Sequence, residues 1–225
     1  TQWSSSAASD VYKRQYLEDL IYRLSETSEV RDRRFEFIIL ENKSINAFAA
    51  PGGIIGINLG MFLNTEKEGE LASVMCHELA HLSQRHFARS QNKNSPLANA
   101  LMILGSIAIA AASRNPEAIM IAPAAMQQMS INYTRSNEKE ADRIGFNNLV
   151  KAGFDPNDMT LIFQRMQDKY QREDSEQFSY LMTHPLPSER LTDMRVRSDN
   201  IDKSSKTIYR DNICLLYTSP SPRDN

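Results

Sequence analysis

Residues 71–82 of the chain read LASVMCHELAHL, and this stretch decides the fold. Apolar residues recur in it every three or four positions, which indicates a helix with one face turned toward a protein core. These residues are Leu71, Val74, Met75, Leu79 and Leu82. We predict one long helix over residues 67–89. Three polar residues lie in its apolar middle, and they need an explanation: His77, Glu78 and His81.

His77, Glu78 and His81 form the pattern H-E-x-x-H. Residues i and i+4 of a helix lie about 40° apart around its axis, so both imidazoles point to one side. Two imidazole nitrogens at that spacing suit tetrahedral zinc, and Glu78 is placed to take a proton from an attacking water. The pattern predicts a zinc hydrolase with one zinc ion per chain and Glu78 as general base. The alternative is a pair of core histidines that bridge neighbouring groups.

The third metal ligand must come from outside this helix. One class of zinc protease places a third histidine six residues after the second, with a glycine between them; here those positions hold Phe87 and Gln84. His86 follows His77 by nine residues, about 900° of helix rotation, which predicts the opposite helix face. We therefore expect His86 to be a surface or outer-sphere residue and not a ligand.

The segment 137–142, NEKEAD, offers two glutamates, and helix geometry separates them. The face of Glu138 carries small residues that permit a close approach to the H-E-x-x-H helix: Ala141, Asp142, Gly145 and Leu149. The face of Glu140 is mostly polar: Ile144, Asn147, Asn148 and Lys151. We predict that Glu138 is the third ligand and that Asp142 accepts the free N–H of a metal-bound histidine. The alternative is a solvated run of acids at a helix N-terminus.

The remaining periodicities predict an α+β fold that is mostly helical. We expect further helices at residues 16–27, 137–152, 157–170 and 187–197. We expect strands at residues 35–40 and 54–59, the second of them returning in a hairpin after the turn at 51–53. The fold is therefore a small sheet or hairpin beside a helical body that carries the H-E-x-x-H helix.

Two apolar runs, residues 97–112 and 118–129, separate the two halves of the predicted site. Sixteen helical residues span about 24 Å, less than the bilayer core of about 30 Å. Polar residues interrupt the first run and Pro123 interrupts the second. We expect buried, alanine-rich core helices, with a contact of residues 97–129 with a membrane surface as the alternative.

Composition narrows the class of protein further. The 225 residues suffice for one domain, and a net charge of −2 gives no electrostatic basis for nucleic-acid binding. Two cysteines are too few for a disulfide scaffold. Residues 1–15 and 213–225 look like translated sequencing-adapter read-through or disordered tails. We expect the domain over residues 16–200 and a linker toward a missing C-terminal domain over 201–212.

These motifs together resemble the HtpX-like and CaaX-prenyl-protease-like zinc metallopeptidases of the gluzincin type. The resemblance rests on H-E-x-x-H with a distant E-x-x-A-D, and it extends to the segments NAFAAPGG at 46–53, GFDP at 153–156 and HPLPSER at 184–190. The last two segments resemble the BepA-like periplasmic branch. The resemblance implies a zincin-like domain and a zinc endopeptidase in envelope quality control, acting on misfolded outer-membrane proteins and linked to the outer-membrane assembly machinery.

The same resemblance implies a periplasmic location, with the signal peptide lost by truncation, and often a C-terminal tetratricopeptide-repeat domain, which this chain lacks. Mitochondrial relatives of this branch act at the inner membrane. Two alternatives stay open: a zinc-bearing chaperone or scaffold with little turnover, and a membrane-anchored protease.

His184 is the remaining histidine with a candidate role. It precedes Pro185, which predicts a loop position. There the imidazole is expected either to take the fourth zinc position or to hydrogen-bond the oxyanion of the reaction. The resemblance favours the first role, a self-inhibitory switch, with Arg190 as a supporting residue; simple packing against the flanking prolines is the alternative. The segment Ala47, Phe48, Ala49 and Ala50 is expected to pair with an extended substrate, or to be an ordinary hairpin strand.

Overall fold

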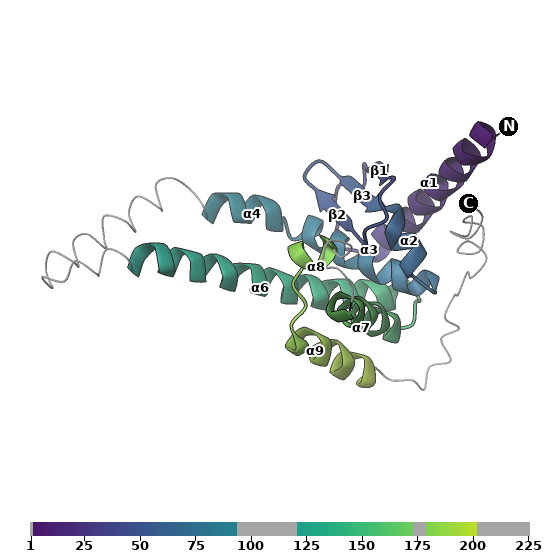
Figure 1. Cartoon of the computed structure of the whole chain (residues 1–225). Helices are drawn as coiled ribbons and strands as arrows, with labels where there is room; N and C mark the ends of the chain where they lie inside the picture. The colour runs from purple at the N-terminus through teal and green to yellow at the C-terminus, as the bar shows by residue number, and fades with distance from the viewer. Residues whose placement is uncertain (1, 94–120, 173–178, 202–225) are drawn as a thin grey trace, which may run out of the picture.

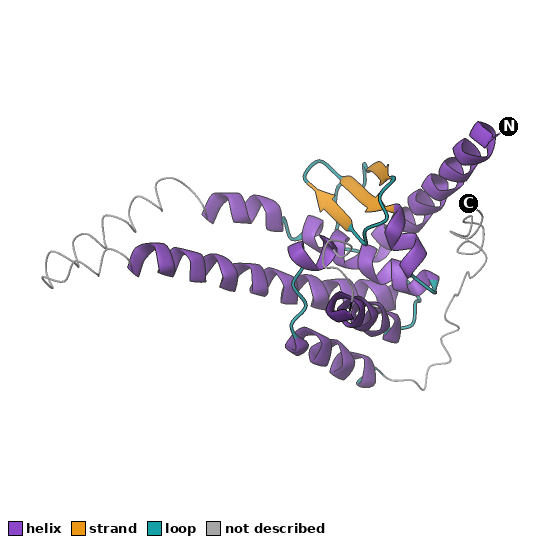
Figure 2. Cartoon of the chain, in the orientation of Figure 1, coloured by secondary structure: helices purple, strands orange, loops and turns teal. Residues whose placement is uncertain are grey.

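The computed structural model describes residues 2–93, 121–172 and 179–201. These residues form a mostly helical α+β domain with one small sheet (Figure 1, Figure 2). The helices are α1 (Gln2–Thr27), α2 (Leu59–Asn64), α3 (Glu68–Ser83), α4 (His86–Lys93), α6 (Ile121–Lys151), α7 (Asn157–Arg172), α8 (Ser179–Thr183) and α9 (Ser188–Asp199). The strands are β1 (Glu36–Leu40), β2 (Ala47–Ala50) and β3 (Ile54–Asn58).

The three strands lie in the order β1-β3-β2, so β2 is at an edge of the sheet. The predicted hairpin is confirmed, because β2 pairs antiparallel with β3 across the turn, whereas β1 runs parallel to β3. Gly53 in this turn has φ +84°, and a Cβ there would stand 2.1 Å from the carbonyl oxygen of Arg34. Only glycine fits this backbone, which holds β2 and β3 in register.

Helix α3 is the centre of the domain. It is buried from Glu68 to Ala80, on every face rather than on one. The sheet packs on it through β2, while α6 and α7 cover it from below in the view of Figure 1. The apolar face of α1 also packs against it, with Leu17, Leu20, Ile21 and Leu24 all buried. A helix enclosed in this way holds its side chains in fixed positions.

The predicted helix over residues 67–89 is wrong in its last part. Helix α3 ends at Ser83, and Arg85 has φ +55° in the left-handed region. A left-handed residue ends a helix and turns the chain, and it is uncommon for a residue other than glycine. A second helix, α4, then begins at His86 and runs alongside α6 (Figure 1). Residues 86–89 therefore do not continue the face pattern of α3.

Helix α6 begins at Ile121, well before the predicted start at residue 137. Its Gly145 lies directly against α3: a Cβ there would stand 3.0 Å from the backbone of Cys76 and His77. This agrees with the close approach expected from the small residues Ala141 and Gly145. The absence of a side chain at residue 145 is what lets the two helices that carry the candidate ligands meet.

Several boundaries differ from those expected. Helix α1 begins at Gln2, so it includes the segment 2–15 expected to lie outside the fold, and Leu59 begins α2 rather than ending a strand. Residues 97–112 and 202–225, and with them most of the expected linker, lie outside the described residues. Within the described ranges, no helix is both long and apolar enough to cross a membrane.

Candidate metal centre

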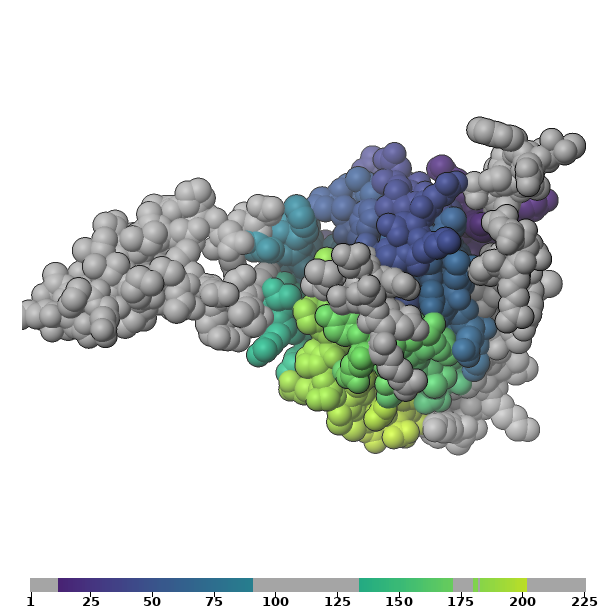
Figure 3. All heavy atoms as spheres, in the orientation of Figure 1, coloured from purple at the N-terminus to yellow at the C-terminus, as the bar shows by residue number. Residues whose placement is uncertain are grey.

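Four side chains from three parts of the chain converge at one point. His77 and His81 come from α3, Glu138 from α6, and His184 from the segment after α8. One ligand atom of each lies within 4.8 Å of those of the other three. Figure 3 shows the N-terminal part, in blue, packed against the C-terminal part, in green to yellow; His77 and His81 belong to the first, and Glu138 and His184 to the second. Neither part alone contains the group.

The spacing of the donor atoms suits a tetrahedral metal. Nε2 of His77 lies 2.9 Å from Nε2 of His81, and each of these nitrogens lies 3.3 Å from an oxygen of Glu138. Metal–ligand bonds of 2.0–2.1 Å in tetrahedral geometry place ligand atoms about 3.3 Å apart. Two imidazole nitrogens and a carboxylate also form a donor set typical of catalytic zinc sites. The residues present therefore fit a metal ion.

The protonation states of the histidines differ. Burial lowers the pKa of His81 to about 4 and that of His184 to about 3, so both rings are neutral at pH 7 and offer a lone pair. Burial also acts to lower the pKa of His77, but Asp142 and Glu138 outweigh it and raise the value to about 9. A metal ion takes the place of that proton, because it binds the deprotonated ring.

Glu78 lies beside the cluster without belonging to it. Its carboxylate is buried, and Oε2 accepts a hydrogen bond from the backbone N–H of Ala49 at 3.1 Å. Its other oxygen lies 3.6 Å from Nε2 of His184. Burial raises the pKa of Glu78 to about 7. A carboxylate with a pKa near neutrality and close to the metal position has the properties of a general base.

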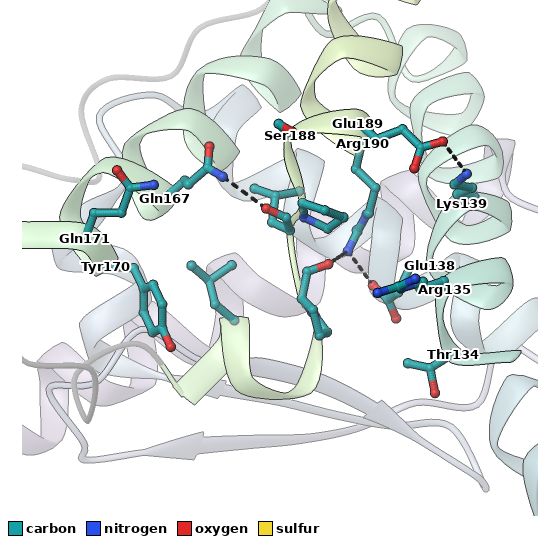
Figure 4. Close-up of a pocket in the computed structure, with 14 residues that line it drawn as sticks. Thr134, Arg135, Glu138, Lys139, Gln167, Tyr170, Gln171, Ser188, Glu189 and Arg190 are labelled. Carbon is teal, nitrogen blue, oxygen red and sulfur yellow. Dashed lines mark hydrogen bonds and ion pairs between the residues drawn. The ribbon is translucent and has the colours of Figure 1, made fainter. Parts of the chain in front are cut away.

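Asp142 and Arg190 form the outer support of His77. Oδ1 of Asp142 lies 3.1 Å from Nδ1 of His77. On its other side, Asp142 accepts two hydrogen bonds from Arg190, at 2.7 and 2.8 Å. Arg190 also donates to the carbonyl of Pro185 at 2.5 Å and lies 2.9 Å from Glu138, so one buried guanidinium joins α6, α9 and the loop after His184 (Figure 4).

His184 follows α8 in a short loop, as expected from Pro185. Its ring stacks on Tyr180 at 4.5 Å between centroids and meets the rings of His77 and His81 edge to face at 5.4 and 5.1 Å. Oγ1 of Thr183 lies 2.9 Å from Nδ1 of His184. This contact leaves Nε2 directed toward the cluster. The stack with Tyr180, which the sequence did not signal, fixes the plane of the ring.

The cleft over the site runs along the edge of β2. It is a cavity of about 710 Å³, lined among others by Phe48, Ala49, Glu78 and His184. Alternate residues of a strand direct their main-chain groups to the same side. Because the N–H of Ala49 points away from β3 to Glu78, the main-chain groups of Ala47 point away from β3 as well. The outer edge of β2 therefore faces the candidate metal position.

A second cavity, of about 880 Å³, lies on the other side of the Pro185–Pro187 loop (Figure 4). Tyr170 and Leu186 form part of its apolar wall, and Arg135 reaches it from α6. It shares Thr134 and Glu138 with the cleft along β2. The loop that carries His184 thus has hollow space on both sides of it.

The opposite-face position predicted for His86 is wrong, whereas its expected place outside the group of candidate ligands agrees with the structure. His86 is buried, and its ring reaches His81 and Glu140. A continuous helix would place His86 on the face opposite His77, but the turn at Arg85 interrupts the helix. Glu140 does not belong to the metal cluster, yet it is not simply solvated: it accepts a hydrogen bond from Arg89 in addition to its contact with His86. No pattern in residues 83–86 signals the turn.

The whole of this site lies within a region that matches a known family. The chain belongs to peptidase family M48, whose model matches residues 12–198. The family implies a metal cofactor, in agreement with the His and Glu cluster.

The chain is also similar in sequence to individual proteases. A relative from Vibrio cholerae is 46% identical over 189 residues, 82% of this chain and 39% of its own. The beta-barrel assembly-enhancing protease of Escherichia coli K12 is 38% identical over 217 residues, 92% of this chain and 44% of its own. The mitochondrial metalloendopeptidase OMA1 of Schizosaccharomyces pombe is 27% identical over 176 residues, 78% of this chain and 50% of its own. The chain thus spans half or less of the length of these relatives.

Proposed function

We propose that this chain is the catalytic domain of a zinc metalloendopeptidase that hydrolyses peptide bonds in unfolded or misfolded proteins. The observation that carries the proposal is the meeting of His77, His81 and Glu138 at one point, with the buried carboxylate of Glu78 beside it. Nothing in a purely structural role requires two neutralisable imidazoles and two carboxylates to be buried together, because burial of charged groups is costly.

His77, His81 and Glu138 hold the zinc ion in this proposal. When bound, zinc supplies Lewis-acid polarisation of the scissile carbonyl and of water. Glu78 takes the proton from the attacking water and passes it to the leaving amine. The backbone N–H of Ala49 orients the Glu78 carboxylate through its hydrogen bond to Oε2. Asp142, held by Arg190, supports the ring of His77 from behind.

The substrate lies in extended form along β2. The carbonyl of Ala49 points away from β3 on the edge of the sheet, beside Glu78, which accepts a hydrogen bond from the N–H of the same residue. Main-chain pairing gives affinity for any unfolded segment without demanding a particular sequence. A folded β-barrel offers no such segment, because its closed sheet leaves no strand edge unpaired.

His184 acts as a regulatory fourth ligand in this proposal. Its Nε2 occupies the side of the cluster where a catalytic metal keeps an open position. Arg190 holds the loop closed through the carbonyl of Pro185, so the ring stays at the site until that loop moves. A role for His184 in binding the oxyanion is the second candidate, since the same ring reaches Glu78.

The names of the relatives direct the substrate proposal. The Escherichia coli relative is named for β-barrel assembly, so we place this chain in quality control of outer-membrane proteins in the periplasm, in contact with their assembly machinery. A zinc-bearing chaperone with little turnover is the alternative, since an edge strand that pairs with unfolded chains binds them whether or not it cuts them.

The test uses the purified chain with an outer-membrane β-barrel protein, offered either unfolded in dilute urea or folded in detergent micelles. We expect about one zinc per chain by elemental analysis and cleavage of the unfolded form only. The matched control is Glu78→Gln, which should retain zinc and lose at least about 100-fold in rate. Zinc without any cleavage supports the chaperone alternative, and a chain that binds no zinc refutes the proposal.

A further inference from the structure

We propose that His86 is a positioning residue for His81, and that Glu140 completes the arrangement behind it. The inference rests on the proposed role of His81 as a metal ligand. It assigns a task to a histidine outside the H-E-x-x-H motif and to a glutamate that is not a ligand. The proposal concerns the orientation of the ring of His81, and through it the affinity of the site for metal.

The three side chains form a linear series. Nδ1 of His81 lies 2.9 Å from Nδ1 of His86, and Nε2 of His86 lies 2.9 Å from Oε2 of Glu140. The rings of His81 and His86 meet edge to face at 4.9 Å between centroids. His86 is only 4% exposed, so water does not replace these contacts.

The direction of each hydrogen bond follows from the metal site. Nε2 of His81 faces His77 and Glu138, so it must keep its lone pair for the metal. The proton of His81 is therefore on Nδ1, which donates to Nδ1 of His86. His86 in turn carries its proton on Nε2 and donates it to Glu140. Every ring nitrogen in the series has one role, and all the roles are mutually compatible.

The backbone is arranged specifically to make this series. Ending α3 at Ser83 and placing Arg85 in the left-handed region brings residue 86 back toward residue 81. A continuous helix would have carried His86 away from residue 81. A left-handed residue other than glycine is unfavourable, so the turn is held by the contacts it makes possible.

The two histidine ligands thus have different supports. His77 meets a carboxylate directly, at 3.1 Å from Asp142. His81 has no carboxylate within reach of its Nδ1 among the described residues, and His86 occupies that place and passes the contact on to Glu140. Arg89, on the first turn after His86, donates to the same oxygen of Glu140 at 3.0 Å and fixes it. Outer-sphere partners of this kind orient a ligand and raise its basicity.

Two substitutions at residue 86 separate positioning from packing. His86→Phe keeps the ring volume and removes the acceptor for His81, whereas His86→Asn keeps an acceptor near the position of Nδ1 and removes the ring. The zinc dissociation constant is measured by competition with a chelator, in a Glu78→Gln background that prevents self-digestion. The spectrum of the cobalt-substituted protein reports the ligand geometry, and thermal unfolding of the metal-free protein reports packing.

We expect His86→Phe to weaken zinc binding about 10- to 100-fold and to change the cobalt spectrum, and His86→Asn to recover most of the affinity. Phe87→Ala, an exposed neighbour on α4, is the control and should leave the affinity unchanged. Adding Glu140→Gln to His86→Phe should cause no further loss, because the series is already broken.

The opposite ranking, with Phe tolerated and Asn damaging, means that His86 only packs and overturns the inference. Unchanged affinity in both variants overturns it as well. If the parent chain itself binds no zinc, the proposed function fails first and this inference fails with it, so the two failures are distinguishable.

Discussion

Arg190 donates two parallel hydrogen bonds to Asp142, from Nε to Oδ2 at 2.7 Å and from Nη2 to Oδ1 at 2.8 Å. The two residues are 48 positions apart in the chain and both are buried. The pair joins α9 to α6 directly behind His77, so the last helix of the described domain is part of the support of the metal cluster.

Breaking this pair should destabilise the whole domain. Arg190→Met leaves the buried Asp142 without its partner, and the loss of one partner of a buried ion pair costs about 3–5 kcal/mol. Urea unfolding monitored by circular dichroism measures the change in free energy of unfolding. The control is Arg195→Met, at an exposed position of the same helix, for which we expect a change within about 0.5 kcal/mol. Equal effects of the two variants would contradict the importance of the pair.

Asp142 should contribute to stability in a pH-dependent way. Burial acts to raise its pKa, but the hydrogen bonds from Arg190 and His77 outweigh burial and hold the pKa below its ordinary value. A carboxyl group with a lowered pKa in the folded state stabilises the protein above its unfolded pKa of about 3.9, and this stabilisation is lost as the pH falls through the folded pKa.

The measurement is the free energy of unfolding of the metal-free chain against pH. Compared with the parent, Asp142→Asn should be less stable near pH 7, and the difference should shrink as the pH is lowered below about 4. A difference that stays constant across this range would show that the charge of Asp142 is not the source of the effect.

The two glutamates of α6 should differ sharply in zinc affinity. Glu138 lies in the cluster, so Glu138→Gln removes a charged donor and should weaken zinc binding by at least about 100-fold. Among the described residues, Glu140 accepts from His86 and Arg89, and the carbonyl of glutamine can still accept, so Glu140→Gln should have an effect of a few-fold at most. A chelator-competition titration measures the zinc affinity of both variants. A larger loss of affinity in Glu140→Gln than in Glu138→Gln would refute the assignment of Glu138 as a ligand.

His184 should restrain the enzyme. We expect His184→Ala to raise the basal rate of proteolysis several-fold while zinc stays bound, because the fourth position is then open to water. Initial rates on an unfolded protein substrate and elemental analysis of the same sample test this together. Thr183→Ala removes only the contact at Nδ1 of His184, so we expect a smaller increase in the rate of proteolysis. A fall in activity with His184→Ala would assign His184 to the oxyanion instead.

Gly145 should be intolerant of even a methyl group. In Gly145→Ala the new Cβ would stand 3.0 Å from the backbone of Cys76 and His77, which cannot yield as a flexible side chain would. Overpacking of this kind costs about 1–3 kcal/mol, and it also separates Glu138 from the histidines of α3. We expect lower stability and weaker zinc binding, measured by thermal unfolding and chelator competition. Asn147→Ala, exposed on the same helix, serves as the matched control, and a Gly145→Ala variant that resembled it would contradict the close packing.

The sequence by itself determined the features that depend on residues close together in the chain. The spacing of His77 and His81 places them on one helix face, and the small residues around Glu138 select the face that approaches α3. Pro185 keeps His184 out of a helix, and the turn at Gly53 makes the hairpin. Each of these predictions depends on residues a few positions apart, whose geometry the backbone itself dictates.

The tertiary structure alone decided the rest. Residues 83–86 contain no glycine or proline, so no residue there signals the turn at Arg85 that brings His86 to His81 and Glu140. Two other contacts likewise join segments far apart in the chain: the parallel pairing of β1 with β3 and the ion pair between Arg190 and Asp142. Such contacts become favourable only once the core has closed and excluded water, because a buried hydrogen bond or ion pair owes its strength to that environment. Short-range patterns in the sequence therefore do not predict these long-range contacts.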